Sequence, residues 1–260
     1  MELKWPLRAK PFCLCVGAVL PLTCLADVVD DSHLSLNFRN LYLNRNFTNP
    51  SAPVSKVGNW SQGFDLQFES GYTDTPLAVG LDLNGQYALR LDATGNDGSL
   101  PYSRHRQQAA DDYSRGGATL KLKYAKTKVL IGDQKPFYPV ASNDPSRQLD
   151  TIYQGAVIES RDIDNLTLVG GKLEHAKGRN SSNNDSLTIA GSNGATRTAT
   201  ANARSNEFYY AGGDYKITKD LTAQYYYGNL SDFYKQHFLG LSHNWALPVG
   251  VFKTDLRYFN

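Results

Sequence analysis

The sequence predicts an all-β fold, an antiparallel transmembrane β-barrel built as an up-and-down meander. The first observation is the segment from Leu77 to Leu91, where every odd position except Gly85 is apolar and the even positions are small or polar. The second is the same two-residue period in several other segments, and the third is the alternation of short and long connections between them. Because strand side chains point alternately to opposite faces, each segment is a strand with one apolar and one polar face.

The length of the segment 77–91 favours a membrane barrel over a globular sheet. Strands of globular proteins typically have ~5–6 residues. A tilted strand that crosses an outer membrane needs ~9–11 residues and can continue into an extracellular hairpin. No apolar run after residue 26 approaches the length of a membrane helix. A barrel needs no such run, because half of each strand faces water.

The first 26 residues have the features of a secretory signal peptide. The segment starts with three basic residues, Lys4, Arg8 and Lys10. A mostly apolar run over residues 12–25 follows, and Ala26 supplies a small residue before the expected cleavage point. A membrane anchor is the alternative, but the run is shorter than ~18 residues and contains Pro21. The sequence thus predicts a signal peptide over 1–26 and a barrel domain over 27–260.

Removal of the signal peptide changes both the cysteine count and the net charge. All three cysteines, Cys13, Cys15 and Cys24, lie within it, so the mature chain would have no disulfide bond. The signal also holds three of the 27 basic and one of the 25 acidic residues, which leaves 24 of each. A net charge of zero gives no basic excess that would indicate a nucleic-acid partner.

About eleven strands are expected along the chain, and their spacing favours an antiparallel meander over βαβ units. The clearest alternation is found in residues 64–69, 77–91, 118–124 and 252–258. Less regular strands are expected at 33–45, 127–133, 153–160, 164–175, 205–217, 220–228 and 236–247. In the first of these the period slips at Asn40, which predicts a β-bulge there.

Polar strand positions should face the lumen, because a Lys or Arg side chain in lipid at mid-membrane costs ~2–4 kcal/mol. Short turns are expected at 71–76, 125–127, 162–165 and 218–220, and long loops at 46–60, 93–116, 134–152 and 176–204. Aromatic clusters such as Phe208–Tyr210 and Tyr225–Tyr227 suit a girdle at the membrane interface. Ordinary β-propensity explains any single cluster nearly as well.

Several strings make the pattern more specific than a generic barrel. They lie at residues 36–45, 60–64, 68–73, 110–115, 143–147, 211–215 and 232–239. In their order across residues 30–260 they resemble the OprD-like family of outer-membrane porins of pseudomonads and their relatives. The resemblance implies a barrel of roughly eighteen strands, narrowed by inward-folded loops. The eleven or so strands found here would then be the amino-terminal part of a longer product, which would leave the barrel incomplete in this chain.

The resemblance also implies a function, the substrate-selective passive diffusion of small carboxylate-bearing solutes such as amino acids or aromatic acids. A ladder of basic lumen side chains would guide the carboxylate. Arg45 at the end of the first strand and Arg147 in the constriction loop would belong to it, and Arg39 lies on the lumen face of the same first strand. Lys56 is a looser match, because the local spacing differs by one residue.

A physical argument for such a ladder can be made without the resemblance to the family. A row of like charges in a narrow, low-dielectric water tube concentrates counter-ions and steers them along the passage. An arginine fork can donate two parallel hydrogen bonds to a carboxylate. Arg45 could instead be a plain rim charge, and Arg147 could pair with Asp144 or Asp150, which are close in sequence.

An enzyme is not expected. The five histidines are scattered without metal-binding spacing, and there is no nucleophile elbow or phosphate-binding loop. No metal or cofactor is predicted. The expected partners are small carboxylate solutes, outer-membrane lipid and lipopolysaccharide, with a homotrimer left open and no nucleic acid. The alternative is a secreted β-rich adhesin or lectin-like binding protein, which would stay in the aqueous phase without detergent.

Overall fold

A computed structural model describes residues 28–52, 54–95, 98–103, 109–188 and 204–260. The predicted signal peptide, residues 1–26, lies outside the described residues, as do parts of the expected loops 93–116 and 176–204. Within the described part no helix is both long and apolar enough to cross a membrane.

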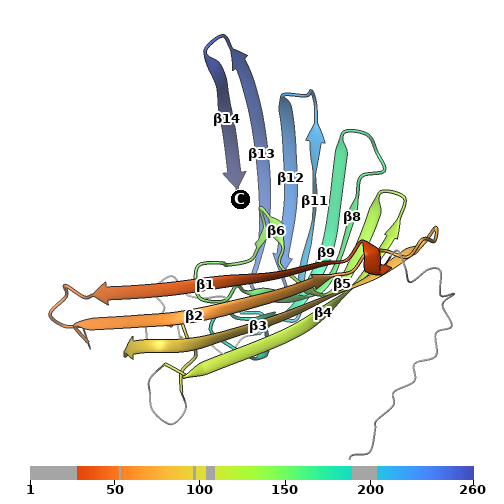
Figure 1. The fold of residues 1–260 in the computed structure, drawn as a ribbon. Coiled ribbons are helices and arrows are strands. Elements are labelled where there is room, and N and C mark those ends of the chain that lie inside the picture. The colour runs from red at the N-terminus through yellow and green to blue at the C-terminus, as the bar shows by residue number, and fades with distance from the viewer. Residues whose placement is uncertain (1–27, 53, 96–97, 104–108, 189–203) are drawn as a thin grey trace, which may run out of the picture.

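One large antiparallel sheet contains eleven strands that follow one another in chain order. They are β1 (His33–Asn46), β2 (Lys56–Glu69), β3 (Ala78–Thr94), β4 (Asp112–Tyr124), β5 (Thr127–Gln134), β8 (Ile152–Ser160), β9 (Leu166–Lys177), β11 (Phe208–Lys216), β12 (Leu221–Leu230), β13 (Tyr234–Leu247) and β14 (Gly250–Phe259). The short β10 (Asn184–Ser186) pairs with β9 off this path. Figure 1 shows that the sheet curves from β1 to β14, so that one face is concave. In the described residues β1 and β14 do not pair with each other, so the sheet is open.

The predicted meander is therefore confirmed, and each of the eleven expected strands is present. Two strands begin six or more residues earlier than expected: β2 at Lys56, inside the expected loop 46–60, and β4 at Asp112, inside the expected loop 93–116. In β2 this early part carries polar side chains on both faces, among them Asn59 and Gln62. Without an apolar face a strand shows no two-residue hydropathy period, so the hydropathy pattern does not indicate where this strand begins.

The bulge predicted at Asn40 is wrong, because β1 and β2 pair without any register shift. Asn40 is a polar residue on the outward face, and this face tolerates it because its side-chain polar atoms are hydrogen bonded. Its Oδ1 accepts a bond of 2.9 Å from Trp60 Nε1, and its Nδ2 donates to Gln62 Oε1 at 3.0 Å. The irregularity lies between β2 and β3, where Leu91 is one extra residue on β3.

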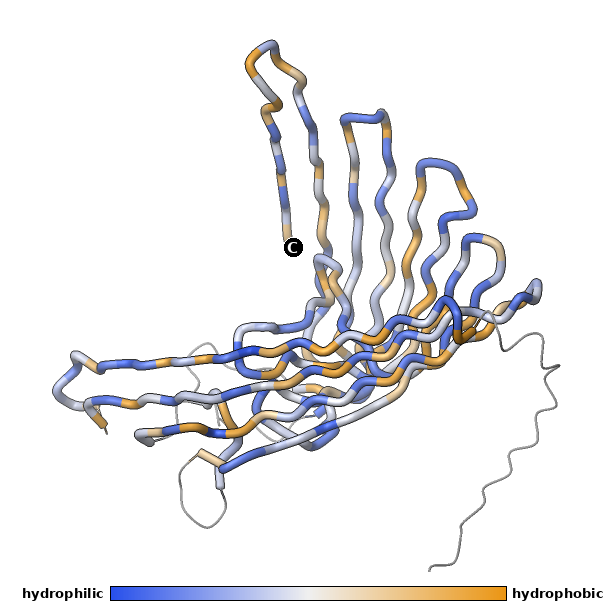
Figure 2. Tube along the Cα trace, in the orientation of Figure 1, coloured by the Kyte–Doolittle hydropathy of each residue, from blue (hydrophilic) through white to orange (hydrophobic). Residues whose placement is uncertain are grey.

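The two faces of the sheet are those that the alternation predicts. In β3 the outward Leu81 and Leu83 are both 46% exposed, whereas Gln86 and Ala88 are 3% and 0% exposed beneath segments that cover the concave face. Figure 2 shows hydrophobic and hydrophilic residues alternating along the strands. The apolar rows thus lie on the convex face and the polar rows on the concave face.

The connections also alternate as expected, with one exception. Short turns join β2 to β3, β4 to β5, β8 to β9 and β11 to β12, and long connections join β1 to β2, β3 to β4, β5 to β8 and β9 to β11. On the long-loop side, however, β12 and β13 are joined by residues 231–233 alone. Asp232 has a φ of 68° in this tight connection, a conformation that Asp tolerates better than most residues.

A small hairpin within the connection from β5 to β8 was not predicted, since β6 (Phe137–Tyr138) and β7 (Ala141–Ser142) are too short to show a period. It packs on the inner face of β9 to β13, where Tyr138 lies 5.6 Å from the Tyr210 ring and 6.1 Å from the Tyr226 ring. Those two rings lie over glycines. A Cβ on Gly171 would approach Tyr210 to 2.6 Å, and one on Gly212 would approach Tyr226 to 2.5 Å.

A first prediction concerns the orientation of the sheet. Leu81→Arg puts a charge on the convex face, where it costs ~2–4 kcal/mol in hydrocarbon, so the full-length protein should fail to assemble in the outer membrane. Heat-modifiable mobility on gels measures assembly. The control Gln67→Arg puts the same charge on the concave face and should assemble. Normal assembly of Leu81→Arg would contradict the orientation.

Candidate permeation site on the concave face

The connection between β5 and β8, residues 135–151, folds back over the concave face of the sheet. Its Leu149 is 3% exposed and packs in a cluster with Ala88 of β3 and Tyr113 of β4. Its neighbour Gln148 is 2% exposed. This segment, called the inner loop below, therefore narrows the space in front of the sheet, as the resemblance to porins implies.

Gln148 fixes the inner loop to β1 and β2. Its Oε1 accepts a hydrogen bond of 2.8 Å from Ser61 Oγ, and its Nε2 donates to the carbonyl of Arg39 at 2.8 Å. A Cβ on Gly63 would lie 2.1 Å from Gln148 Nε2, so the seat for this amide exists only because residue 63 is glycine. The loop thus has a defined position on the wall.

Arg39 of β1 holds the inner loop at a second point. Its Nη1 donates to the carbonyls of Pro145 at 2.9 Å and Arg147 at 2.6 Å, and lies 3.5 Å from Asp150 Oδ1. All three contacts use Nη1. The Nη2 and Nε groups make no hydrogen bond within the described part of the chain, and the side chain is 44% exposed. One edge of the guanidinium is therefore anchored and the other is presented to the concave space.

Arg115 of β4 holds the loop at a third point from the other side. Its Nε donates to Gln86 Oε1 at 2.7 Å, its Nη1 donates to the carbonyl of Lys177 at 3.1 Å, and its Nη2 donates to the carbonyl of Asp150. Arg115 is 7% exposed, and a buried guanidinium is tolerated only when its donors find acceptors. This arginine is a structural tie between β3, β9 and the inner loop.

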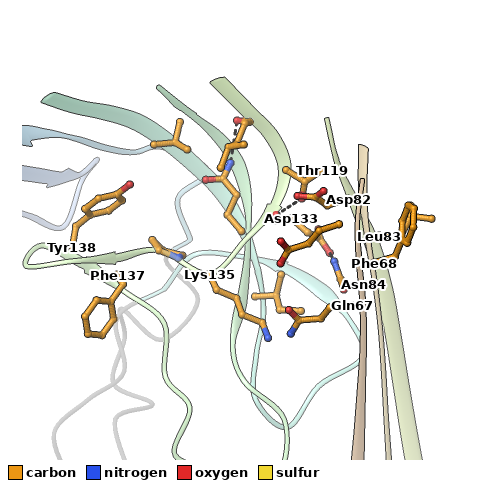
Figure 3. Close-up of a pocket in the computed structure, with 16 residues that line it drawn as sticks. Gln67, Phe68, Asp82, Leu83, Asn84, Thr119, Asp133, Lys135, Phe137 and Tyr138 are labelled. Atoms are coloured by element: carbon orange, nitrogen blue, oxygen red, sulfur yellow. Dashed lines mark hydrogen bonds between the residues drawn. The ribbon is translucent and has the colours of Figure 1, made fainter. Parts of the chain in front are cut away.

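Two hollows that are lined in part by charged side chains lie on the concave face beside the inner loop. One of about 400 Å³ is lined by Asp82, Asp133 and Lys135 among others, and one of about 360 Å³ by Arg39, Asp65 and Lys135 among others. Lys135 lines both hollows. It bridges two carboxylates, with Nζ 3.0 Å from Asp65 and 3.2 Å from Asp150. Figure 3 shows Gln67, Asn84 and Asp82 on the side of the strands that faces Lys135, with Phe68 and Leu83 on the other side.

Cations on this wall are mostly neutralised by neighbouring acids. Lys121 lies 2.6 Å from Asp82, and Lys177 lies 2.5 Å from Asp133. Both lysines are about nine-tenths buried, so each ammonium group is fixed in its pair. The wall therefore carries balanced charge pairs rather than a continuous row of free cations.

Arg45 is a predicted ladder residue that faces the concave side and stays unpaired among the described residues. It lies directly opposite Val57, and opposite residues of antiparallel strands project from the same face. Val57 is buried on the concave side, so Arg45 points to that side too. It is exposed and makes no ion pair or hydrogen bond with any described residue. Arg39 and Arg45 are six positions apart on β1, about 20 Å at ~3.3 Å per residue.

The other two predicted residues lie elsewhere. Arg147 is in the inner loop, with Nη1 donating to the carbonyl of Ser146 at 3.0 Å and its own carbonyl accepting from Arg39. Lys56 lies opposite Asn46 at the edge of β2, on the outward face that also carries Trp60. The structure thus brings Arg39 and Arg147 together, places Arg45 at the rim above them, and places Lys56 on the opposite face.

The acids near Arg147 have other partners. Asp150 pairs with Arg39 and Lys135, as described above, and Asp144 pairs with Arg179 after β9. Sequence reasoning missed Arg115, Lys135 and Gln148 as residues that set the inner loop. Arg115 fell within the expected loop 93–116, and its partner Lys177 lies 62 residues further along the chain, so no local pattern indicated this contact.

Asp144 ties the inner loop to the segment that follows β9. Partial burial alone would raise the pKa of its carboxyl group, but hydrogen bonds from Ser146 and the Arg179 guanidinium hold that pKa below its usual range. The Ser146 amide donates to Asp144 Oδ1 at 2.9 Å, and Arg179 Nη1 also donates to Ser146 Oγ at 2.9 Å. The contact therefore depends on an ionised carboxylate.

Comparison with known proteins gives a consistent match. Residues 26–260 match the family described as outer membrane porin, OprD family. The Porin-like protein GalP of Pseudomonas putida is 32% identical over 248 residues, covering 94% of this chain and 58% of that protein. Porin D of Pseudomonas aeruginosa is 31% identical over 224 residues, covering 85% and 47%. The chain thus spans about half the length of these curated relatives.

Solved structures agree in fold. OccK8 (OprE) of Pseudomonas aeruginosa is 44% identical with a TM-score of 0.78, covering 89% of this chain and 54% of that one. A BenF-like porin from Pseudomonas fluorescens is 30% identical with a TM-score of 0.82, covering 89% and 58%. OpdK of Pseudomonas aeruginosa, crystallised with vanillate, is 27% identical with a TM-score of 0.76, covering 89% and 57%.

The anchoring by Arg39 can be tested. Arg39→Gln should make amides of the inner loop exchange hydrogen about tenfold faster, since a hydrogen bond from a charged donor contributes ~1.5–3 kcal/mol. Hydrogen exchange followed by mass spectrometry measures this. The control Asn37→Ala lies on the same strand and face, lines the same hollow and should leave the loop protected. Equal protection in wild type and Arg39→Gln would remove this anchor.

A pH effect should follow from Asp144. A carboxyl pKa that is lowered in the folded state contributes stability above the ordinary aspartate range, and this contribution is lost as pH falls through the lowered pKa. A spin label at the exposed Ser142 should therefore gain mobility only below the ordinary aspartate range. Asp144→Asn should be mobile at neutral pH and lack this transition. A spin label that stays immobile in Asp144→Asn at every pH would show that Asp144 does not hold the inner loop to the segment after β9.

Proposed function

Because the chain belongs to the OprD family of outer-membrane porins, we propose that it forms part of a channel for substrate-selective passive diffusion of small carboxylate-bearing solutes. The family confirms two predictions from the sequence, the location in the Gram-negative outer membrane and the absence of enzymatic activity. It also decides against the alternative of a secreted adhesin. The solute class and the residues that guide it are the proposal.

The observation that carries the proposal is the inner loop anchored across the concave polar face. A passage that is narrowed by a fixed segment forces a solute into contact with individual side chains, and selectivity arises from those contacts. Gln148, Arg39 and Arg115 hold the loop at three separate points. The narrowing is therefore a defined element rather than a loose obstruction.

Carboxylate selectivity is assigned to Arg45 and Arg39. The free guanidinium of Arg45 can donate two parallel hydrogen bonds to a carboxylate at the rim. The anchored guanidinium of Arg39 presents its Nη2 and Nε edge near the narrowing, in the geometry of the same bidentate bond. Two weak sites about 20 Å apart on β1 let a solute be released by one and taken up by the other.

Arg147 and Lys56 have smaller parts in the proposal. The Arg147 guanidinium bonds to Ser146, and its carbonyl fixes Arg39, so we assign it to positioning of the inner loop. Lys56 on the outward face is not assigned to the solute path. The homotrimer expected from the resemblance stays a prediction.

An aromatic side chain in the inner loop widens the proposal to aromatic acids. Phe137 is 87% exposed, while the next residue, Tyr138, packs on the wall. Phe137 also lines the larger hollow with Lys135, which places a ring and a cation at one site (Figure 3). The relative OpdK was crystallised with vanillate, an aromatic carboxylate. A solute that combines a ring with a carboxylate would place its ring against Phe137 and its carboxylate at the free arginine groups, because Lys135 is already paired with Asp65 and Asp150.

The proposal predicts that Arg45→Ala lowers benzoate flux through the reconstituted full-length protein by about fivefold, since an exposed charge pair contributes up to ~1 kcal/mol. Flux of the neutral analogue benzamide should not change. Liposome uptake measures both solutes, and Arg45→Lys should retain part of the benzoate flux because it keeps the charge. Asn46→Ala, at the same strand end but on the outward face, is the matched control. An equal loss for benzoate and benzamide, or no loss, would remove Arg45 from the path.

A further inference from the structure

An apolar groove of about 830 Å³ runs along the convex face over β8, β9, β11, β12 and β13. Its floor is made of small residues, Gly170, Ala211 and Gly213, and its sides include Leu168, Tyr225 and Leu239. The side residues are 44%, 47% and 51% exposed. Pairing aligns Gly170 with Ala211 and Leu168 with Gly213, so the floor and sides form rows across neighbouring strands. In the membrane this face lies against lipid.

The floor is recessed at Gly170, whereas a Cβ on Gly213 would lie 3.1 Å from Leu168 Cδ2. A Cβ on Gly170 would meet no atom closer than 3.8 Å, so the space above it is open. Ala211 is next to it across the strand pair and is exposed. Bulky neighbours, Leu168 and Tyr225 among them, line the groove beside this floor.

A row of polar groups lies next to the groove at its long-loop end. Lys172, Tyr209, Asn229 and Lys235 are in register across β9, β11, β12 and β13. They lie one row beyond Gly170 and Ala211 toward the loops. Lys235 is exposed and has no ion-pair partner in the part of the chain that the structure describes. The Lys172 ammonium lies 5.6 Å from the Tyr209 ring centroid and 2.8 Å from Glu174 Oε1, so it shares its charge with an acid.

From this arrangement we propose that the convex groove binds lipid A, with one acyl chain on the Gly170–Ala211 floor and a phosphate at Lys235 and Lys172. Long loops of outer-membrane barrels face the cell exterior, which puts the cationic row at the outer leaflet. The phosphorylated lipid of that leaflet is lipid A. Ammonium, amide and phenol groups all donate hydrogen bonds to phosphate oxygens, and the groove below them is apolar.

The proposal uses the membrane orientation of the sheet but not the carboxylate selectivity proposed above. Lipid binding is measured on the outside of the barrel and solute flux on the inside. A loss of lipid binding with normal benzoate flux, or the reverse, would therefore separate the two proposals.

Native mass spectrometry of the full-length protein, titrated with bis-phosphorylated lipid A in detergent, tests the proposal. Lys235→Gln should weaken binding about fivefold, the effect of one basic group beside an anionic headgroup. Ala211→Leu, which fills the floor with an apolar side chain, should weaken it at least as much. Lys219→Gln removes a cation from the turn end of the same strands and should leave binding unchanged. Heat-modifiable mobility shows that each variant is folded.

Other results would overturn the proposal. Unchanged binding in folded Lys235→Gln and Ala211→Leu would show that lipid A does not use this groove. Equal or tighter binding of a phosphatidylglycerol probe with the same dependence on both residues would assign the groove to a different lipid. A dimer that is lost in Ala211→Leu, without lipid binding, would assign this face to a second copy of the chain. Dephosphorylated lipid A should bind more weakly and be insensitive to Lys235→Gln.

Discussion

The pairing of backbone groups between neighbouring strands is the constraint on which the rest of the structure depends. Hydrocarbon offers no hydrogen-bond partner, so each strand must bond to its neighbours. A meander meets this demand with local connections, and each of the eleven strands on the main path pairs with the next along the chain. Once the convex face is committed to lipid, polar residues on it must lie in pairs, such as Asn40 and Gln62, or near the long-loop ends of the strands, as Lys235 does.

The concave face has a different requirement, because it must hold many charged side chains in a narrow space. Lys177 with Asp133 and Lys121 with Asp82 show the solution, in which cations and acids neutralise each other at the wall. Such pairs stiffen the wall and leave little net field. Selectivity must therefore come from the few groups that are left over, the free Arg45 and the unanchored edge of Arg39. A porin of this type can favour carboxylates without a basic composition.

The features that depend on the two-residue hydropathy period could be predicted from the sequence. The contacts between segments far apart in the chain could not. The strands, their faces and the inward direction of Arg39 follow from alternation, which is local. Arg45 was assigned to the lumen by the resemblance instead, because the period slips at Asn40 and Arg45 shares its parity with Leu41 and Leu43. The early start of β2 was missed because Asn59 and Gln62 make both faces polar there. Gln148 and Lys135 were missed because their partners on β1 and β2 lie 70 or more residues away, at positions set by the path of the inner loop. Lys56 was placed in the lumen by a loose match in spacing, whereas the unbroken β1–β2 register puts it outside.

The proposed lipid groove and the support of the inner loop's hairpin share one section of wall. In the dipeptides Gly170–Gly171 and Gly212–Gly213, one glycine faces each side. Gly171 and Gly212 make room inside for the Tyr210 and Tyr226 rings, on which the hairpin of the inner loop rests. Gly170 and Gly213 form the floor of the groove outside. Because neither face carries side chains at these points, the backbone alone separates lipid from the support of the inner loop. A lipid seated in the groove would therefore contact the same strand segments that position the narrowing.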